Sequence, residues 1–86
     1  MQEFEYTIKD PVGVHARPAG VLIKTAGAFK CDIALFAKDQ KISLKGSIFQ
    51  LLGLGIRCGE KIKISCSGDD EVQAAQQLQT VLQENL

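Results

Sequence analysis

Residues 13–20 read Gly13-Val14-His15-Ala16-Arg17-Pro18-Ala19-Gly20, and they join a glycine-containing loop to a helical pattern. A proline is tolerated only in the first turn of a helix, where its missing N–H costs no hydrogen bond. Apolar residues then recur at helical spacing until a natural stop at Gly27: Ala16, Ala19, Leu22, Ile23 and Ala26. We therefore expect a helix that begins within a residue or two of His15.

His15 is the only histidine of the chain, and Arg17 follows two residues later. A helix N-terminus disfavours a cation, so the imidazole is expected to be neutral and nucleophilic at pH 7. If a phosphoryl group were attached, unpaired N–H groups of Ala16, Arg17 and Ala19 would bond its oxygens, and the guanidinium would offset its charge. From these residues alone the alternative stays open that His15 only caps the helix and Arg17 is solvated.

The remainder of the chain predicts a β-α-β-β-α-β-α order. Period-two alternation predicts strands over residues 3–9, 32–37, 41–44 and 61–66, with residues 38–41 forming a hairpin turn. A short helix is expected over 47–52, and a last helix opens near residue 69. Its expected buried stripe is Val72, Ala75, Leu78, Val81 and Leu82, with Leu86 as a further candidate. This order favours an α+β fold of two layers, with the helices on one face of a largely antiparallel sheet.

Composition limits the classes of function. The 86 residues suffice for one domain, residues 1–86, and 45% of them are hydrophobic. Ten basic residues balance ten acidic ones, which argues against nucleic-acid binding. Three cysteines without paired spacing and a single histidine predict no metal site, and no cofactor is expected. With no secretory signal and no apolar stretch long enough to span a bilayer, a cytoplasmic protein is expected.

Residues 13–19 closely resemble the active-site signature of the HPr family, the histidine-containing phosphocarriers of the bacterial sugar phosphotransferase system. Length, element order and a second motif, residues 47–55, extend the resemblance over the whole chain. It implies an open-faced sandwich of four antiparallel strands and three helices. It also implies a monomeric carrier, itself no enzyme, that takes a phosphoryl from enzyme I on Nδ1 of His15 and passes it to IIA units of sugar permeases. Arg17 would be the charge partner.

The second motif implies regulation and docking. Ser47, the expected N-cap of the short helix, matches the serine that an ATP-dependent kinase phosphorylates in many Gram-positive members, with a serine phosphorylase and a catabolite-control transcription factor as further partners. Phosphate at a helix N-terminus is favourable.

Leu51 and Leu54 are expected to face the core. The resemblance implies that the docking surface for partners comprises Ala16, Gly20, Lys24, Ile48, Phe49 and Leu52, and a basic rim of Lys24, Lys45 and Arg57 is an additional hypothesis.

Three departures and two alternatives accompany this interpretation. The segment after Ser47 differs from the usual Gram-positive motif, and the chain ends Glu84-Asn85-Leu86 where the family has a terminal acid. Val12 stands where the family usually has a small polar residue, and Gly46 is an apparent extra residue before Ser47. One alternative is an HPr-like paralogue of a nitrogen-related, regulatory or dihydroxyacetone kinase relay. The other is a ferredoxin-like binding module, which the lack of aromatic residues in the strand over 62–66 disfavours.

Overall fold

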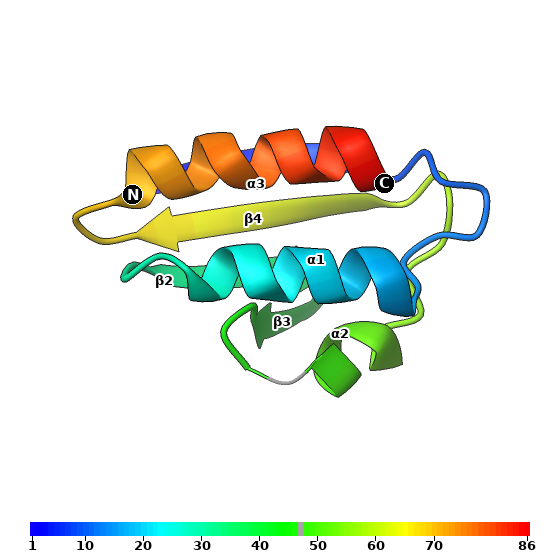
Figure 1. The fold of residues 1–86 in the computed structure, drawn as a ribbon. Coiled ribbons are helices and arrows are strands. Elements are labelled where there is room, and N and C mark those ends of the chain that lie inside the picture. The colour runs from blue at the N-terminus through cyan, green and yellow to red at the C-terminus, as the bar shows by residue number, and fades with distance from the viewer. Residues whose placement is uncertain (47) are drawn as a thin grey trace.

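The computed structural model describes residues 1–46 and 48–86. The predicted order of elements is confirmed (Figure 1): β1 (Gln2–Thr7), α1 (Ala16–Gly27), β2 (Asp32–Ala37), β3 (Gln40–Ser43), α2 (Ile48–Gly53), β4 (Lys61–Ser67) and α3 (Glu71–Asn85). The prediction that Ser47 caps α2 lies outside the described residues.

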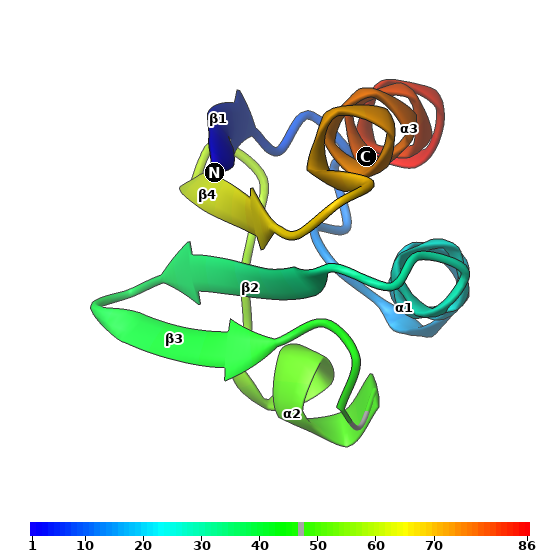
Figure 2. The same ribbon diagram turned by 90° about the vertical axis from the view of Figure 1, so that its left-hand side faces the viewer.

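The strands form an antiparallel sheet in the order β1-β4-β2-β3 within the described chain. Figure 2 shows the helices on one side of this sheet, with α1 and α3 side by side and α2 near the end of β3. No helix of the described residues lies over the opposite face. The α+β open-faced sandwich predicted from the sequence is therefore confirmed.

The core lies between the sheet and the helices, and strand alternation decides which residues enter it. Ile33, Leu35 and Ala37 of β2 are buried, as are Ile62 and Ile64 of β4. Their neighbours along each strand point to the open face, because successive side chains of a strand alternate. The hairpin turn is shorter than predicted. Only two residues, 38 and 39, connect β2 to β3, and both have positive φ, as a type I′ turn requires.

The predicted buried stripe of α3 is wrong at its first position. Val72 is 51% exposed, and Ala74 is fully buried instead. At about 100° per residue, Val72 lies about 120° around the helix from buried Leu78, whereas Ala74 lies only about 40° away. Ala75 and Leu82 are buried as expected, Leu86 is buried, and Val81 is partly buried. The apolar spacing located the helix correctly but misplaced the edge of its buried face.

Asp70 ties the start of α3 to the loop before β2. Its carboxylate accepts the backbone N–H of Lys30 at 2.8 Å and that of Cys31 at 3.0 Å. The hydrogen bond from Lys30 is the main cause that lowers the pKa of Asp70 below its ordinary value. Burial, reinforced by Asp70, raises the pKa of the Cys31 thiol to about 11. This thiol is therefore protonated at pH 7 and is a poor nucleophile.

Replacement of Asp70 is expected to change the acid sensitivity of the fold. A carboxyl with a lowered folded-state pKa stabilises the fold above its ordinary value of 3.8, and this contribution is lost as pH falls through the lower folded value. Asp70→Asn should therefore unfold at a lower temperature than the wild type at pH 7. The difference between the two unfolding temperatures should narrow as pH falls below about 4. Thermal unfolding followed by circular dichroism checks this, with Asp69→Asn as the matched control. An unchanged gap at every pH would contradict the assignment.

Candidate phosphoryl-accepting site

His15 occupies the N-cap of α1. Its backbone is extended, with φ −126° and ψ −178°, and its carbonyl oxygen accepts the N–H of Ala19 at 3.0 Å. The side chain forms no capping hydrogen bond and is 39% exposed. Pro18 lies in the first turn, as the sequence predicted, and its side chain is buried. The histidine is thus fixed at the helix start by its backbone while its ring remains accessible.

Two of the three backbone N–H groups that were expected to bind a phosphoryl group are free within the described chain. The N–H of Ala19 is engaged by the carbonyl of His15, so it is not available to an anion. The N–H groups of Ala16 and Arg17 precede the first helical hydrogen bond, and no acceptor for them lies among the described residues. Two N–H donors, rather than three, are therefore offered next to the imidazole.

The loop before His15 is pressed against the segment that follows α2. Gly13 has φ +81°, and a Cβ at this position would lie 2.6 Å from the Ile56 carbonyl oxygen and 2.8 Å from Cα of Arg57. The same carbonyl accepts the N–H of Val14 at 2.9 Å. Only glycine allows so close an approach in this conformation. The close approach of Gly13 to Ile56 therefore fixes the position of the loop that leads into α1.

Asp10 is a residue of the site that sequence reasoning missed. Its Oδ2 lies 3.7 Å from Nε2 of His15, and its Oδ1 accepts the N–H of Val12 at 2.8 Å. The N–H of Asp10 itself donates to the Leu86 carbonyl oxygen at 2.8 Å. A carboxylate near Nε2 favours the tautomer that carries its proton there, which leaves the lone pair on Nδ1. The only sequence signal was an acid placed five residues before the histidine in a turn.

The predicted charge partner and two residues of the predicted basic rim are exposed, whereas the third residue of the rim is bound elsewhere. Arg17 is exposed and forms no ion pair with a carboxylate of the described residues. Arg57 is exposed, and its backbone lies directly beneath Gly13. Lys24 is exposed in the last turn of α1. Lys45, in contrast, donates from Nζ to the Phe29 carbonyl, so its charge is engaged away from the histidine.

The predicted docking residues of α1 and α2 are adjacent. A Cβ at Gly20 would lie 3.8 Å from Cδ1 of Ile48, so the two helices pack at this point. Phe49 is 79% exposed, and Ile48 and Leu52 are half-buried. Ala16 is exposed at the other end of this surface.

The two core predictions for this segment are confirmed. Leu51 and Leu54 are buried, which turns Phe49 and its neighbours outward. The side chain of Val12 is 71% exposed and offers no hydrogen bond, although its backbone N–H is engaged by Asp10. The structure therefore places an exposed apolar surface on the same helix pair as the histidine.

No group of three or more His, Cys, Asp or Glu side chains is arranged to hold a metal ion among residues 1–46 and 48–86. Likewise, none of the helices in the described part of the chain is long and apolar enough to cross a membrane.

A small α+β protein with an accessible imidazole at a helix N-terminus, free backbone donors next to it and an arginine two residues later in the chain is suited to carrying a phosphoryl group on histidine. Residues 2–84 match the family model described as the PTS HPr component phosphorylation site. The phosphocarrier protein HPr of Mycoplasma genitalium is 40% identical over 99% of this chain and 97% of that protein.

Solved structures agree. A mycoplasma histidine-containing phosphocarrier protein superposes with a TM-score of 0.92 at 36% identity, covering 96% of this chain and 93% of the other. HPr from Thermoanaerobacter tengcongensis gives a TM-score of 0.90 at 34% identity, with coverage of 98% and 93%. The chain belongs to the HPr family of phosphocarriers of the phosphotransferase system.

Proposed function

We propose that His15 receives a phosphoryl group from phosphorylated enzyme I, which phosphoenolpyruvate charges, and delivers it to IIA units of sugar permeases. The Nδ1 lone pair attacks phosphorus, a phosphorus–nitrogen bond forms, and the bond to the donor breaks. With the proton already on Nε2 beside Asp10, no proton has to leave the ring. The observation that carries this proposal is the accessible His15 ring beside two unpaired N–H donors at the start of α1.

In this proposal the chain is a relay intermediate and no enzyme, because the flanking proteins supply the reaction partners. Transfer of a phosphoryl group depends mainly on positioning and charge stabilisation, which an exposed site shares with its partner. We further propose a cytoplasmic monomer, made of one domain over residues 1–86, that needs no cofactor. Incubation with purified enzyme I and phosphoenolpyruvate, followed by assay of acid-labile phosphate on the chain, tests the proposal.

Arg17 is proposed to stabilise the charge of the transferred group. Arg17→Gln should lower kcat/KM for phosphorylation by enzyme I about 10- to 100-fold, because a hydrogen bond to a charged group contributes about 1.5–3 kcal/mol. Steady-state assay over a range of chain concentrations measures this. Lys30→Gln, which removes a cation from an exposed position after α1, is the matched control and should leave the rate unchanged. Equal effects of both variants would reduce the role of Arg17 to general electrostatic attraction.

The docking surface proposed for both partners comprises Ala16, Gly20, Lys24, Ile48, Phe49 and Leu52. Exposed apolar side chains surrounded by charge are typical of transient protein contacts. Titration of the ¹⁵N-labelled chain with enzyme I should shift the amide signals of this set and leave those of α3 in place. Shifts centred on α3 or on the open face of the sheet would overturn the assignment.

Regulatory phosphorylation of Ser47 is a separate proposal, supported by the resemblance of residues 47–55 to the second motif of the family. Phosphate there would add negative charge beside Ile48 and Phe49 and should weaken docking of enzyme I. A serine kinase from the same genome, supplied with ATP, should modify the wild-type chain and leave Ser47→Ala unmodified. Failure to modify the wild type would remove the kinase, the phosphorylase and the transcription factor from the set of partners.

A further inference from the structure

The carboxylate of Asp10 lies beside the ring of His15 and is held there by the turn that carries it. In the turn over residues 10–13 the Asp10 carbonyl oxygen accepts the N–H of Gly13 at 2.9 Å. Asp, Pro and Gly are the residues favoured at the first, second and fourth positions of such a turn. The N–H of Asp10 donates to the Leu86 carbonyl oxygen at 2.8 Å, so its backbone is bound on both sides. Asp10 therefore has little freedom to move away from the ring.

The two oxygens of this carboxylate have different partners. Oδ1 accepts the N–H of Val12 at 2.8 Å, and Oδ2 lies 3.7 Å from Nε2 of His15. No cation within the described chain forms an ion pair with Asp10, so the charge on Oδ2 acts on the imidazole alone. Hydrogen bonds of reacting groups are often this long before the reaction partner binds, and they shorten afterwards.

We propose that Asp10 is a positioning residue for both transfers at His15, a role that depends on the proposed phosphocarrier function. A carboxylate only accepts hydrogen bonds, so it keeps a proton on Nε2 before and after phosphorylation. When the phosphoryl group is passed on, the bond between phosphorus and Nδ1 breaks and its electron pair stays on Nδ1. The nucleophile of the acceptor forms the new bond to phosphorus, and Nε2 keeps its proton. The leaving group is then a neutral imidazole, which leaves far more readily than an imidazolate.

Replacement by asparagine separates this role from the structural role of the side chain. In Asp10→Asn the amide oxygen can still accept the N–H of Val12, which leaves the NH₂ group on the side of Nε2. An NH₂ group only donates, so it favours a ring that accepts at Nε2 and carries its proton on Nδ1. That tautomer has no lone pair on Nδ1 with which to attack phosphorus, and the same exchange in other carboxylate–histidine pairs traps the wrong tautomer. Asp10→Ala removes both contacts and should leave the two tautomers mixed.

The two variants are therefore expected to rank in opposite order for stability and for transfer. Asp10→Asn keeps the hydrogen bond to Val12, so it should unfold at a higher temperature than Asp10→Ala. In phosphorylation by enzyme I and in delivery to a IIA unit, kcat should fall about 30-fold in Asp10→Asn but only about three-fold in Asp10→Ala, with KM nearly unchanged. A purely structural role would make Asp10→Ala the worse variant in both measurements.

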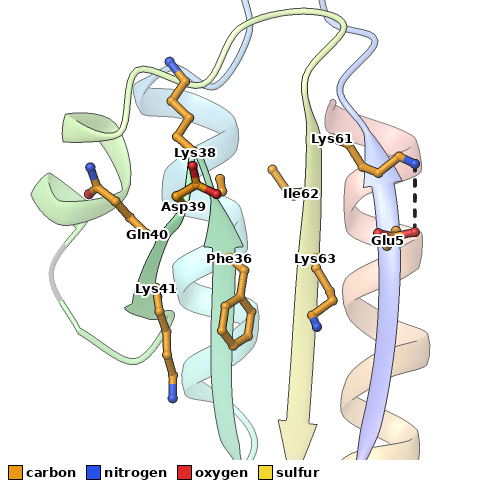
Figure 3. A pocket seen from close by; sticks show the side chains of 10 residues that line it. Glu5, Phe36, Lys38, Asp39, Gln40, Lys41, Lys61, Ile62 and Lys63 are labelled. Carbon is orange, nitrogen blue, oxygen red and sulfur yellow. Dashed lines mark ion pairs between the residues drawn. The ribbon is translucent and has the colours of Figure 1, made fainter.

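The tautomer itself is measured from the ¹⁵N shifts of the His15 ring in the labelled full chain at about pH 8.5, where an imidazole is neutral. The wild type should carry its proton mainly on Nε2, and Asp10→Asn mainly on Nδ1. The matched control is Glu5→Gln, which removes a carboxylate that pairs with Lys61 at 3.9 Å on the open face of the sheet (Figure 3). It should match the wild type in tautomer and in both rates. This measurement needs no enzyme I, so it tests Asp10 even if the wild type accepts no phosphoryl group and the proposed function fails.

Three results would overturn the role of Asp10. They are a wild-type tautomer in Asp10→Asn, wild-type transfer rates in that variant, and slower transfer by Asp10→Ala than by Asp10→Asn. Circular dichroism checks that both variants are folded. If Asp10→Asn is unfolded, Asp10→Ala decides alone, and a ring protonated on Nε2 to the same extent as in the wild type would overturn the proposal. If Asp10→Ala is unfolded, the comparison of Asp10→Asn with Glu5→Gln decides.

Discussion

His15→Ala is expected to accept no phosphoryl group from enzyme I, even at high enzyme concentration and long incubation. No other side chain of the site supplies a nitrogen nucleophile at pH 7, because Arg17 is permanently protonated. The variant should remain folded. The imidazole makes no capping hydrogen bond, so its loss should change the free energy of unfolding by no more than about 0.5 kcal/mol.

The measurement is incorporation of ³²P from phosphoenolpyruvate, with thermal unfolding recorded on the same sample. Lys30→Gln serves as the control that should become fully labelled. Acid-labile label on a folded His15→Ala chain would show that the phosphoryl is held elsewhere. An unlabelled but unfolded variant would be replaced by His15→Gln, which preserves polarity and size more closely and should also remain unlabelled.

Gly13→Ala is expected to damage both the fold and the transfer of phosphoryl. A methyl group would lie 2.6 Å from the Ile56 carbonyl oxygen and 2.8 Å from Cα of Arg57, both of which are backbone atoms that cannot rotate away. The φ of +81° adds strain of about 1–2 kcal/mol for a residue with a Cβ. Relief requires the loop to move, which carries His15 with it. A loss of about 2–4 kcal/mol in the free energy of unfolding is expected.

Urea denaturation measures the stability, and the enzyme I assay at a temperature where the variant is folded measures the transfer. The rate should fall at least ten-fold beyond what the folded fraction explains, because displacement by about 1 Å removes much of the benefit of positioning. Gly27→Ala is the matched control at the other end of α1. A Cβ there meets nothing within 4 Å, so this variant should be as stable as the wild type or more so. Wild-type stability and rate in Gly13→Ala would contradict the account.

The sequence was most informative where a local rule acts on a single residue. Pro18 fixed the start of α1, because proline excludes all but the first turn of a helix. Alternation predicted the buried side chains of β2 and those of β4, except that Ser65 of β4 is also buried although it alternates with the residues that face the helices. The resemblance to the HPr family predicted the family and the fold, and the family match over residues 2–84 agrees with it.

Features that depend on contacts between distant segments escaped prediction. Asp10 lies close to His15 because its backbone is held by the Leu86 carbonyl and by the turn over residues 10–13. No local sequence pattern predicts this contact. The exposure of Val72 follows from how α3 rotates on the sheet, which apolar spacing alone leaves open.

The aromatic residue of the open face escaped for the same reason. β2 is central in the sheet as well as the strand over residues 62–66, and only the strand order β1-β4-β2-β3 places Phe36 between two lysines.

The most direct test of the central claim is to locate the phosphoryl group on the wild-type chain. After incubation with enzyme I and phosphoenolpyruvate, ³¹P and ¹H–¹⁵N NMR of the ¹⁵N-labelled protein identify both the residue and the ring nitrogen that carry it. We expect one acid-labile phosphoryl on Nδ1 of His15, with the proton retained on Nε2. A phosphoryl on Nε2, on Ser47 or on any other residue under these conditions would contradict it.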